Sequence, residues 1–198
     1  MSDVVALTFD DGPDPSGTPA VLRALDAIGA RATFFVVAPR ALRHLALIRD
    51  VLTTGHDVQL HCWEHIRHSG LTRPELEAQT DRALDALARL GIAPTRWRTP
   101  WGDRAPWTEE VAAARGLELT GWTVDTRDWR GDGWTVMLAR LEESLVPGDV
   151  VLMHDGVGPG ARRNHCHATA DLVAPLAALA AVRGWRLGPL DSATACTP

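Results

Sequence analysis

Short apolar runs alternate with amphipathic stretches along the whole chain, and this alternation constrains the fold more than any other feature of the sequence. The runs predict seven strands, at residues 4–9, 31–37, 57–60, 95–98, 117–124, 149–153 and 185–190. Strands that alternate with helices form βαβ units and pair in parallel. We therefore expect an α/β fold, namely a distorted (β/α) barrel of about seven parallel strands, complete or incomplete. An open doubly wound sheet is the alternative.

Two of the intervening helices have recognisable first residues. Thr18 and Pro19 open one of them, because proline is well tolerated at the first helical position. Thr72 and Glu75 have the spacing of a capping box, and the apolar residues that follow at helical spacing stop at Gly91. No repeat or linker interrupts this organisation, so we expect a single domain over residues 1–198.

Composition and charge exclude several classes of protein. Apolar residues make up 45% and charged residues 23%, as in a soluble globular domain. The net charge of −5 gives no basic surface for nucleic acid. No apolar run reaches the ~18 residues of a membrane span, and the start lacks a secretion signal. We therefore expect a cytoplasmic protein with neither a nucleic acid nor a membrane as partner.

The chain also lacks residues that some catalytic mechanisms need. All 20 basic residues are arginine and there is no tyrosine, which excludes a lysine Schiff base and a tyrosine acid. The three cysteines, Cys62, Cys166 and Cys196, cannot all pair within one chain, so free thiols are expected.

Polar clusters follow five of the predicted strands, at the point where each strand ends. The carboxyl ends of parallel strands carry the active sites of such folds, so we expect these clusters to converge. They are Asp10-Asp11-Gly12-Pro13, His61-Cys62-Trp63-Glu64-His65, Arg98-Thr99-Pro100-Trp101-Gly102, Asp125-Thr126-Arg127-Asp128-Trp129 and His154-Asp155-Gly156.

A metal site is the first interpretation of these clusters. His61 and His65 are four residues apart, so on a helical turn both rings lie on one face and can bind one ion. Two histidines and a carboxylate leave open positions for water and substrate, and Asp11 can supply the carboxylate. Cys62 is the weaker candidate for a ligand, because a neighbour of His61 points elsewhere. The alternative is a surface pair of histidines among solvated carboxylates.

Five ordered motifs carry a resemblance to a known family. From about Leu7 to Leu190 the chain resembles the polysaccharide deacetylase (NodB-homology) family, carbohydrate esterase family four. Cys62 and Ile66 depart from its pattern, which usually has Ser or Thr and often Pro there, but neither change removes a ligand. The motifs are Thr8-Phe9-Asp10-Asp11-Gly12-Pro13, His61-x-x-x-His65, Arg98-x-Pro100-Trp101-Gly102, Asp125-x-x-Asp128-Trp129 and Leu152-x-His154.

The resemblance implies a distorted β/α barrel and a site that binds a divalent metal. The metal in this family is usually zinc, and cobalt is a further candidate. By resemblance its ligands are Asp11, His61 and His65. Asp10 is implied as the general base that activates the water on the metal.

The remaining roles are also implied by resemblance. Arg98 orients Asp10, and Asp128 in turn holds Arg98. The backbone N–H of Trp101 helps to bind the oxyanion. His154 is the general acid that protonates the leaving amine, a role that suits histidine because its pKa lies near neutral pH.

The expected function is metal-dependent removal of an N-acyl group, first of all acetyl. The expected substrate is a soluble amino sugar, an oligosaccharide or a small acetamido metabolite. One alternative is a non-sugar amide or cyclic imide hydrolysed at the same site. A second, from another class, is an inert sugar-binding module, for which Asp10, Arg98 and His154 would be unnecessary.

Two weaker signals leave alternatives open. His165-Cys166-His167 either forms a second, structural metal site or belongs to a solvated loop at the rim of the site. Several tryptophans in the loops above the predicted site either stack on the substrate or pack against the barrel. They are Trp101, Trp107, Trp129 and Trp134.

Overall fold

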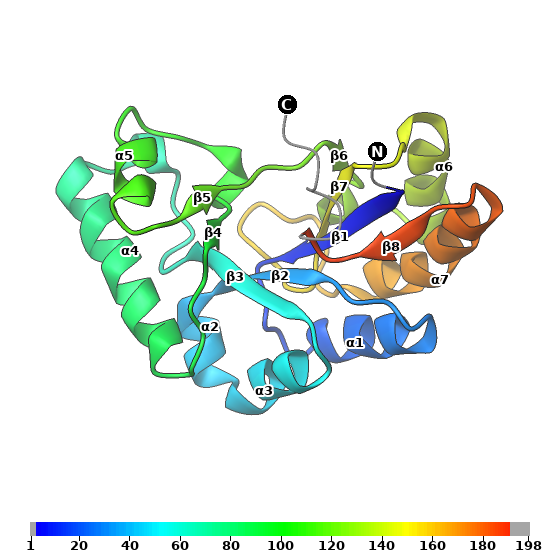
Figure 1. Ribbon diagram of the computed structural model, residues 1–198, viewed down its shortest axis with the longest axis horizontal. Helices are drawn as coiled ribbons and strands as arrows, with labels where there is room; N and C mark the ends of the chain where they lie inside the picture. The colour runs from blue at the N-terminus through cyan, green and yellow to red at the C-terminus, as the bar shows by residue number, and fades with distance from the viewer. Residues whose placement is uncertain (1–2, 191–198) are drawn as a thin grey trace.

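The structure is a computed structural model that describes residues 3–190, so Cys196 lies outside the described part. The strands, all paired in parallel, are β1 (Val4–Asp10), β2 (Thr33–Val37), β3 (Asp57–Cys62), β4 (Arg96–Trp97), β5 (Glu118–Leu119), β6 (Val124–Asp125), β7 (Val150–His154) and β8 (Arg186–Gly188). Seven follow the order β5-β4-β3-β2-β1-β7-β6, and β8 pairs with β1. The α/β fold and the distorted (β/α) barrel are therefore confirmed (Figure 1).

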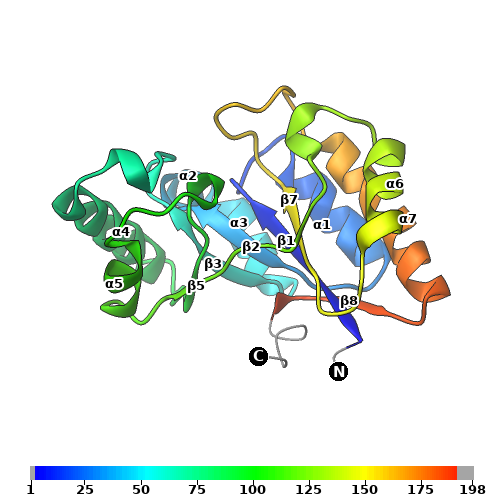
Figure 2. The same cartoon turned by 90° about the horizontal axis from the view of Figure 1, so that it is seen from above.

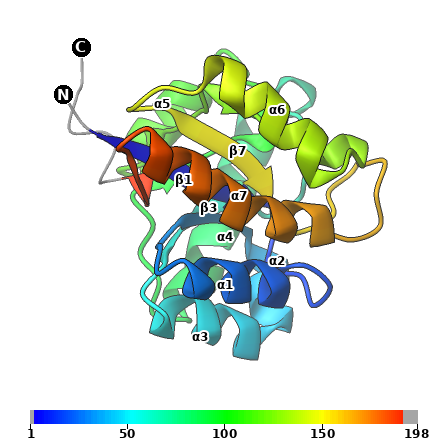
Figure 3. The same ribbon diagram turned by 90° about the vertical axis from the view of Figure 1, so that its right-hand side faces the viewer.

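The helices lie outside the curved sheet (Figures 1 and 2). In Figure 3, α6, α7, α1 and α3 succeed one another around one side, while α4 and α5 lie at the other end in Figure 2. No helix within residues 3–190 is long and apolar enough to cross a bilayer. The helices are α1 (Thr18–Ala27), α2 (Ala38–Arg43), α3 (Leu45–Thr53), α4 (Arg73–Ala88), α5 (Thr108–Ala113), α6 (Trp134–Ser144) and α7 (His167–Val182), with short 3₁₀ turns η1 (His68–Gly70), η2 (Pro100–Gly102) and η3 (Asp128–Arg130).

The predicted helix starts at Thr18 and Thr72 are confirmed. Proline lies in the first turn of α1. At α4, the N–H of Thr72 donates to Oε2 of Glu75 over 2.8 Å, and the reciprocal bond from the N3 backbone to the Thr72 side chain completes a capping box. Gly91, which follows α4 with φ 75°, supplies the left-handed residue that ends a helix at little steric cost.

The prediction of one strand over residues 117–124 is wrong. The segment contains two strands, β5 and β6, which lie at the two ends of the sheet order and are joined by residues 120–123. The carbonyl oxygens of Thr120 and Gly121 accept hydrogen bonds from the Arg98 guanidinium instead of from a neighbouring strand. The barrel is therefore open between β5 and β6, and a side chain spans the gap.

Strand β1 is buried on both faces, which explains its uninterrupted apolar start. Val5, Leu7 and Phe9 belong to the large core shared with the helices. Val4 and Ala6 pack on the opposite face, in a small cluster inside the barrel. Because side chains alternate along a strand, Thr8 and Asp10 continue this inner face. The alternation therefore places Asp10 inside the mouth of the barrel.

Candidate metal and catalytic site

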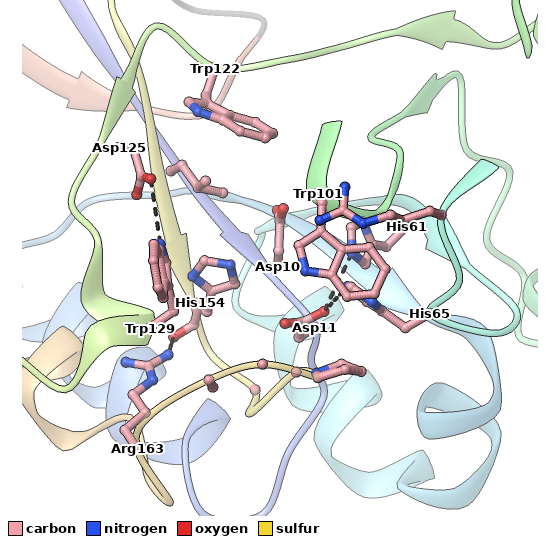
Figure 4. A pocket seen from close by; sticks show the side chains of 17 residues that line it. Asp10, Asp11, His61, His65, Trp101, Trp122, Asp125, Trp129, His154 and Arg163 are labelled. Atoms are coloured by element: carbon pink, nitrogen blue, oxygen red, sulfur yellow. Dashed lines mark hydrogen bonds and ion pairs between the residues drawn. The ribbon is translucent and has the colours of Figure 1, made fainter. Parts of the chain in front are cut away.

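The end of β1 directs two neighbouring carboxylates toward different partners. Asp10 ends the strand and faces Arg98. Asp11 has φ 72°, a left-handed conformation that is uncommon outside glycine, and a cis peptide bond joins Gly12 to Pro13 beyond it. The left-handed conformation at Asp11 points its carboxylate toward His61 and His65 (Figure 4).

His61 and His65 face the Asp11 carboxylate. Their Nε2 atoms lie 3.4 and 3.2 Å from Oδ1 of Asp11, and one ligand atom from each of the three residues lies within 4.8 Å of the others. Nδ1 of His61 is 2.7 Å from the carbonyl oxygen of Arg98. Because a carbonyl only accepts hydrogen bonds, Nδ1 carries a proton, and Nε2 is the ring nitrogen available to a metal ion.

The two histidines do not share the expected helical turn. His61 belongs to β3, and His65 lies in the loop that follows the strand. The loop folds back so that the ring centroids are 5.0 Å apart. The convergence is as predicted, but the local structure that was expected to produce it is wrong, because spacing alone cannot distinguish a helical turn from a turn after a strand.

The donor atoms of this cluster fit a divalent metal. Oδ1 of Asp11 is buried and receives no hydrogen bond. Burial acts to raise the pKa of Asp11, but the imidazoles of His61 and His65 hold it well below its usual range, so the carboxylate is ionised. An anionic oxygen and imidazole nitrogens that face one point are ligands suited to zinc and related cations. Asp11, His61 and His65 would hold the ion.

Cys62 and the His165-Cys166-His167 segment lie outside this cluster. Cys62 is free and buried, and it is not among the residues grouped around Asp11. Cys166 is also free and fully buried, while the rings of His165 and His167 stack on each other at 4.5 Å. Within residues 3–190, no second group of three or more metal-ligating side chains is found. The open alternative of a second metal site therefore gains no support.

Asp10 is fixed by a buried arginine. Nη1 of Arg98 lies 2.9 Å from Oδ1 of Asp10 and 2.7 Å from Oγ1 of Thr8. The guanidinium stacks on Phe35 at 4.1 Å, and its other nitrogens donate to the carbonyls between β5 and β6. Arg98 is fully buried and each of its three side-chain nitrogens donates to a protein oxygen, so the orientation of Asp10 is set by the barrel interior.

The expected pairing of Asp128 with Arg98 is wrong. Oδ1 of Asp128 lies 2.7 Å from Nδ1 of His154, and Oδ2 accepts the backbone N–H of His154 at 2.9 Å. Oδ2 also accepts from Thr169 at 2.7 Å and is 3.2 Å from Arg163. Both carboxylate oxygens of Asp128 are thus occupied by His154 and its neighbours, and not by Arg98, which faces Asp10.

Asp128 keeps His154 protonated at neutral pH. Burial alone would lower the pKa of His154, but the Asp128 carboxylate outweighs it and raises the pKa to about 9. Burial likewise acts to raise the pKa of Asp128, yet His154 and Arg163 hold it below its usual range. Since Nδ1 donates to Asp128, the other ring nitrogen remains for a ligand. Both ring nitrogens of His154 thereby carry a proton, and the hydrogen bond to Asp128 fixes the orientation of the ring.

These groups surround one pocket of about 330 Å³ (Figure 4). It brings together the carboxylates at the end of β1, the imidazoles of His61 and His65, and His154 from β7, as the sequence predicted. Side chains that the sequence did not single out also line it, among them Trp122, Arg67 and Arg163. Trp122 sits in the segment expected to be a strand, and no spacing or motif marked the other two.

Two of the four tryptophans that were expected above the site line the pocket. Trp101 and Trp129 line the pocket, and the Trp101 indole meets His65 edge-on at 4.2 Å. Trp107 packs against the main core, and Trp134, 38% exposed at the start of α6, does not line the pocket. The oxyanion role of the Trp101 backbone stays a prediction. Trp101 has φ 55° and lies at the kink of η2.

A (β/α) barrel with carboxylates, histidines and an arginine gathered at the carboxyl ends of its strands is suited to hydrolysis, the class of reaction that deacetylases catalyse. The polysaccharide deacetylase family model matches residues 1–120. The chain belongs to this family, which confirms the resemblance stated above.

Similar proteins share this class. The chain is 36% identical over 174 residues to a chitooligosaccharide deacetylase of Bradyrhizobium sp. (strain ANU 289), covering 84% of this chain and 77% of that protein. It is 34% identical over 152 residues to the peptidoglycan-N-acetylglucosamine deacetylase PgdA of Listeria monocytogenes, covering 76% of this chain but only 32% of PgdA. The crystal structure of the Bc1960 peptidoglycan N-acetylglucosamine deacetylase superposes with a TM-score of 0.89 at 28% identity, over 97% of this chain and 88% of that one.

Proposed function

We propose that this protein is a divalent-metal-dependent N-deacetylase that acts on an amino sugar, either a monomeric acetamido compound or a short oligosaccharide. Zinc is the first candidate for the metal, and cobalt the second. The observation that carries the proposal is the convergence of Asp11, His61 and His65 beside Asp10 and His154 in one pocket. Release of free amine from N-acetylglucosamine oligomers, measured with and without a chelator, tests it.

The side chains divide the reaction between them. A divalent ion at the three ligands would supply a water activated at neutral pH and polarise the acyl carbonyl. Asp10, oriented by Arg98, takes the proton of the attacking water through its carboxylate. His154, protonated and held by Asp128, donates a proton to the amine nitrogen as it leaves. The Trp101 backbone N–H is the proposed donor to the oxyanion.

The pocket favours a small ligand. Its volume of about 330 Å³ lies at the lower end of the range for small-molecule sites, about 300–1,000 Å³. Trp101, Trp122 and Trp129 line it, together with Gly156 and Gly158 of the loop after β7. Indole faces at a pocket wall suit the flat faces of sugar rings.

Additional sugar units beyond the first few are therefore expected to bring no gain in kcat/KM. An enzyme that grips several sugar units along a groove gains kcat/KM with chain length, because binding of remote units orients the reacting one. We predict a higher kcat/KM on mono- or short oligomeric N-acetyl compounds than on polymeric N-acetylglucosamine or peptidoglycan. Kinetics on a series from monomer to hexamer, with polymer as the end point, measures this. A steady rise through the longest members would contradict the small-substrate proposal.

The pH dependence should report the proton on His154. Only the protonated ring can donate, so on the alkaline side of the profile kcat/KM should fall as the pH rises through the pKa of His154. A cation at Asp11 opposes protonation, so the fall should come at or below a pH of about 9. In Asp128→Asn the carboxylate charge is lost while burial remains, and the fall should move to lower pH. Asp132→Asn, which alters a surface ion pair with Arg140, serves as the control. An unmoved profile in Asp128→Asn would exclude His154 as the acid.

The alternatives make different demands on the same residues. A non-sugar amide or imide hydrolase would use all of them, and a substrate panel of both classes distinguishes it. An inert binding module would need neither the buried Asp10–Arg98 pair nor a protonated His154, and absence of turnover on every N-acyl compound would favour it. The cytoplasmic location stays a prediction, which fractionation of producing cells would test.

A further inference from the structure

Asp11 reaches its position through a backbone conformation that needs support. Its φ of 72° lies in the left-handed region, which is unfavourable for a residue with a Cβ. Its carbonyl oxygen accepts from Nη1 of Arg40 at 2.8 Å. Arg40 lies in α2, directly after β2, and the N–H of Val37 at the end of β2 donates to the carbonyl of Gly12 at 2.9 Å. The β2–α2 connection therefore holds two consecutive carbonyls of the turn that contains Asp11.

The Arg40 guanidinium also binds the loop after β7, which lies next to Asp11. Nη2 of Arg40 donates to the carbonyl of Val157 at 2.8 Å, in the loop that follows β7. This loop lies directly against Asp11, since a Cβ on Gly156 would be 2.5 Å from its carbonyl oxygen and one on Gly158 would be 2.1 Å from its Oδ2. Asp14 lies 3.6 Å from Nη1 and balances the charge of Arg40.

We propose that Arg40 is a positioning residue for the metal site: its two donors join the Asp11 turn to the loop after β7 and thereby aim the Asp11 carboxylate at His61 and His65. The inference rests on the metal site of the proposed function. A guanidinium can bridge two carbonyls through a rigid fork of N–H groups, whereas a lysine ammonium is a point charge on a flexible stem. The fork, and not the charge alone, does the positioning.

Zn²⁺ affinity tests this proposal, because losing the charge of Arg40 and losing its positioning contacts should change the affinity in opposite directions. Removal of a nearby positive charge should by itself strengthen cation binding. Loss of the positioning contact should weaken it, by about 10–100-fold for outer contacts of metal ligands. We expect Arg40→Met to weaken Zn²⁺ binding by this amount, measured by competition with a chromophoric chelator. Arg40→Lys, which keeps the charge but not the fork, should also bind Zn²⁺ more weakly than the unmodified protein. Arg43→Met, an exposed position in the same helix, is the matched control and should leave affinity unchanged.

Each outcome decides between the proposals. Unchanged or tighter Zn²⁺ binding in Arg40→Met, with His61→Ala still abolishing binding, would overturn the role of Arg40 and leave the metal site intact. Undiminished Zn²⁺ binding in His61→Ala would instead overturn the site itself. Far-ultraviolet circular dichroism of the metal-free variants establishes that they are folded. Should Arg40→Met not fold, Arg40→Lys carries the test, and wild-type affinity in that variant would overturn the requirement for the fork.

Discussion

Removal of the divalent metal is expected to reduce deacetylation to the background rate, and added Zn²⁺ or Co²⁺ should restore it. Without an ion, nothing in the site lowers the pKa of water or polarises the acyl carbonyl. His61→Ala should lose the metal permanently, because two remaining ligands hold a cation far less tightly than three and Nε2 of His61 is one of the converging atoms. Metal content by elemental analysis and free-amine release measure both effects.

Cys62→Ser is the matched control for His61→Ala. It changes the adjacent buried residue, keeps the side chain small, and introduces a residue type usual in the family at that position. The variant should keep both metal and activity. Loss of metal in Cys62→Ser would identify the thiol as a ligand, and full activity of metal-free protein would exclude the proposed mechanism.

Asp10→Asn should keep the metal and lose turnover by ~10²–10⁴-fold, the range for general acid–base groups. An amide cannot take a proton from water, and it also leaves the buried Arg98 without its anionic partner. Metal content should be unchanged because Asp10 is not among the converging ligand atoms. Comparable turnover with Asn at this position would show that Asp10 is not the base.

His154→Ala should also keep the metal, but its loss should depend on the leaving group. An amine must be protonated as it leaves, whereas an activated aryl ester releases a stable phenolate without help. The loss on an N-acetyl sugar is therefore expected to exceed the loss on an aryl acetate. An ester-to-amide ratio equal to that of the unmodified protein would argue that His154 is not the acid.

Much of this architecture could be predicted because local pattern and final geometry agree. The inward alternation of β1 ends on Asp10, and strand ends converge at one edge of a parallel sheet, so residues such as His61 and His154 meet in the expected pocket. Arg98 facing Asp10 followed from the family motifs, and the structure has this contact.

The missed features depend on tertiary contacts that no local pattern encodes. Residues 117–124 read as one apolar run, yet Gly121 lies between two short strands at opposite ends of the sheet. The partner of Asp128 is His154 at the end of β7, a tertiary contact that motif order does not reveal. Arg40 donates to the carbonyl of Asp11 and Arg163 to that of His154, and any residue type can supply a carbonyl, so these contacts leave no signature in the sequence.

Because the barrel is open between β5 and β6, Arg98 contacts a proposed metal ligand, the proposed base and the segment that crosses the opening. Its carbonyl oxygen fixes the His61 ring, its guanidinium fixes Asp10, and the same guanidinium holds the chain that crosses the gap. The first contact belongs to the main chain and survives any substitution of the side chain, whereas the second and third do not. Local unfolding of this edge would therefore displace Asp10, the proposed base, while the three proposed ligands stay assembled, so the protein could bind metal, keep its core folded and yet be inactive.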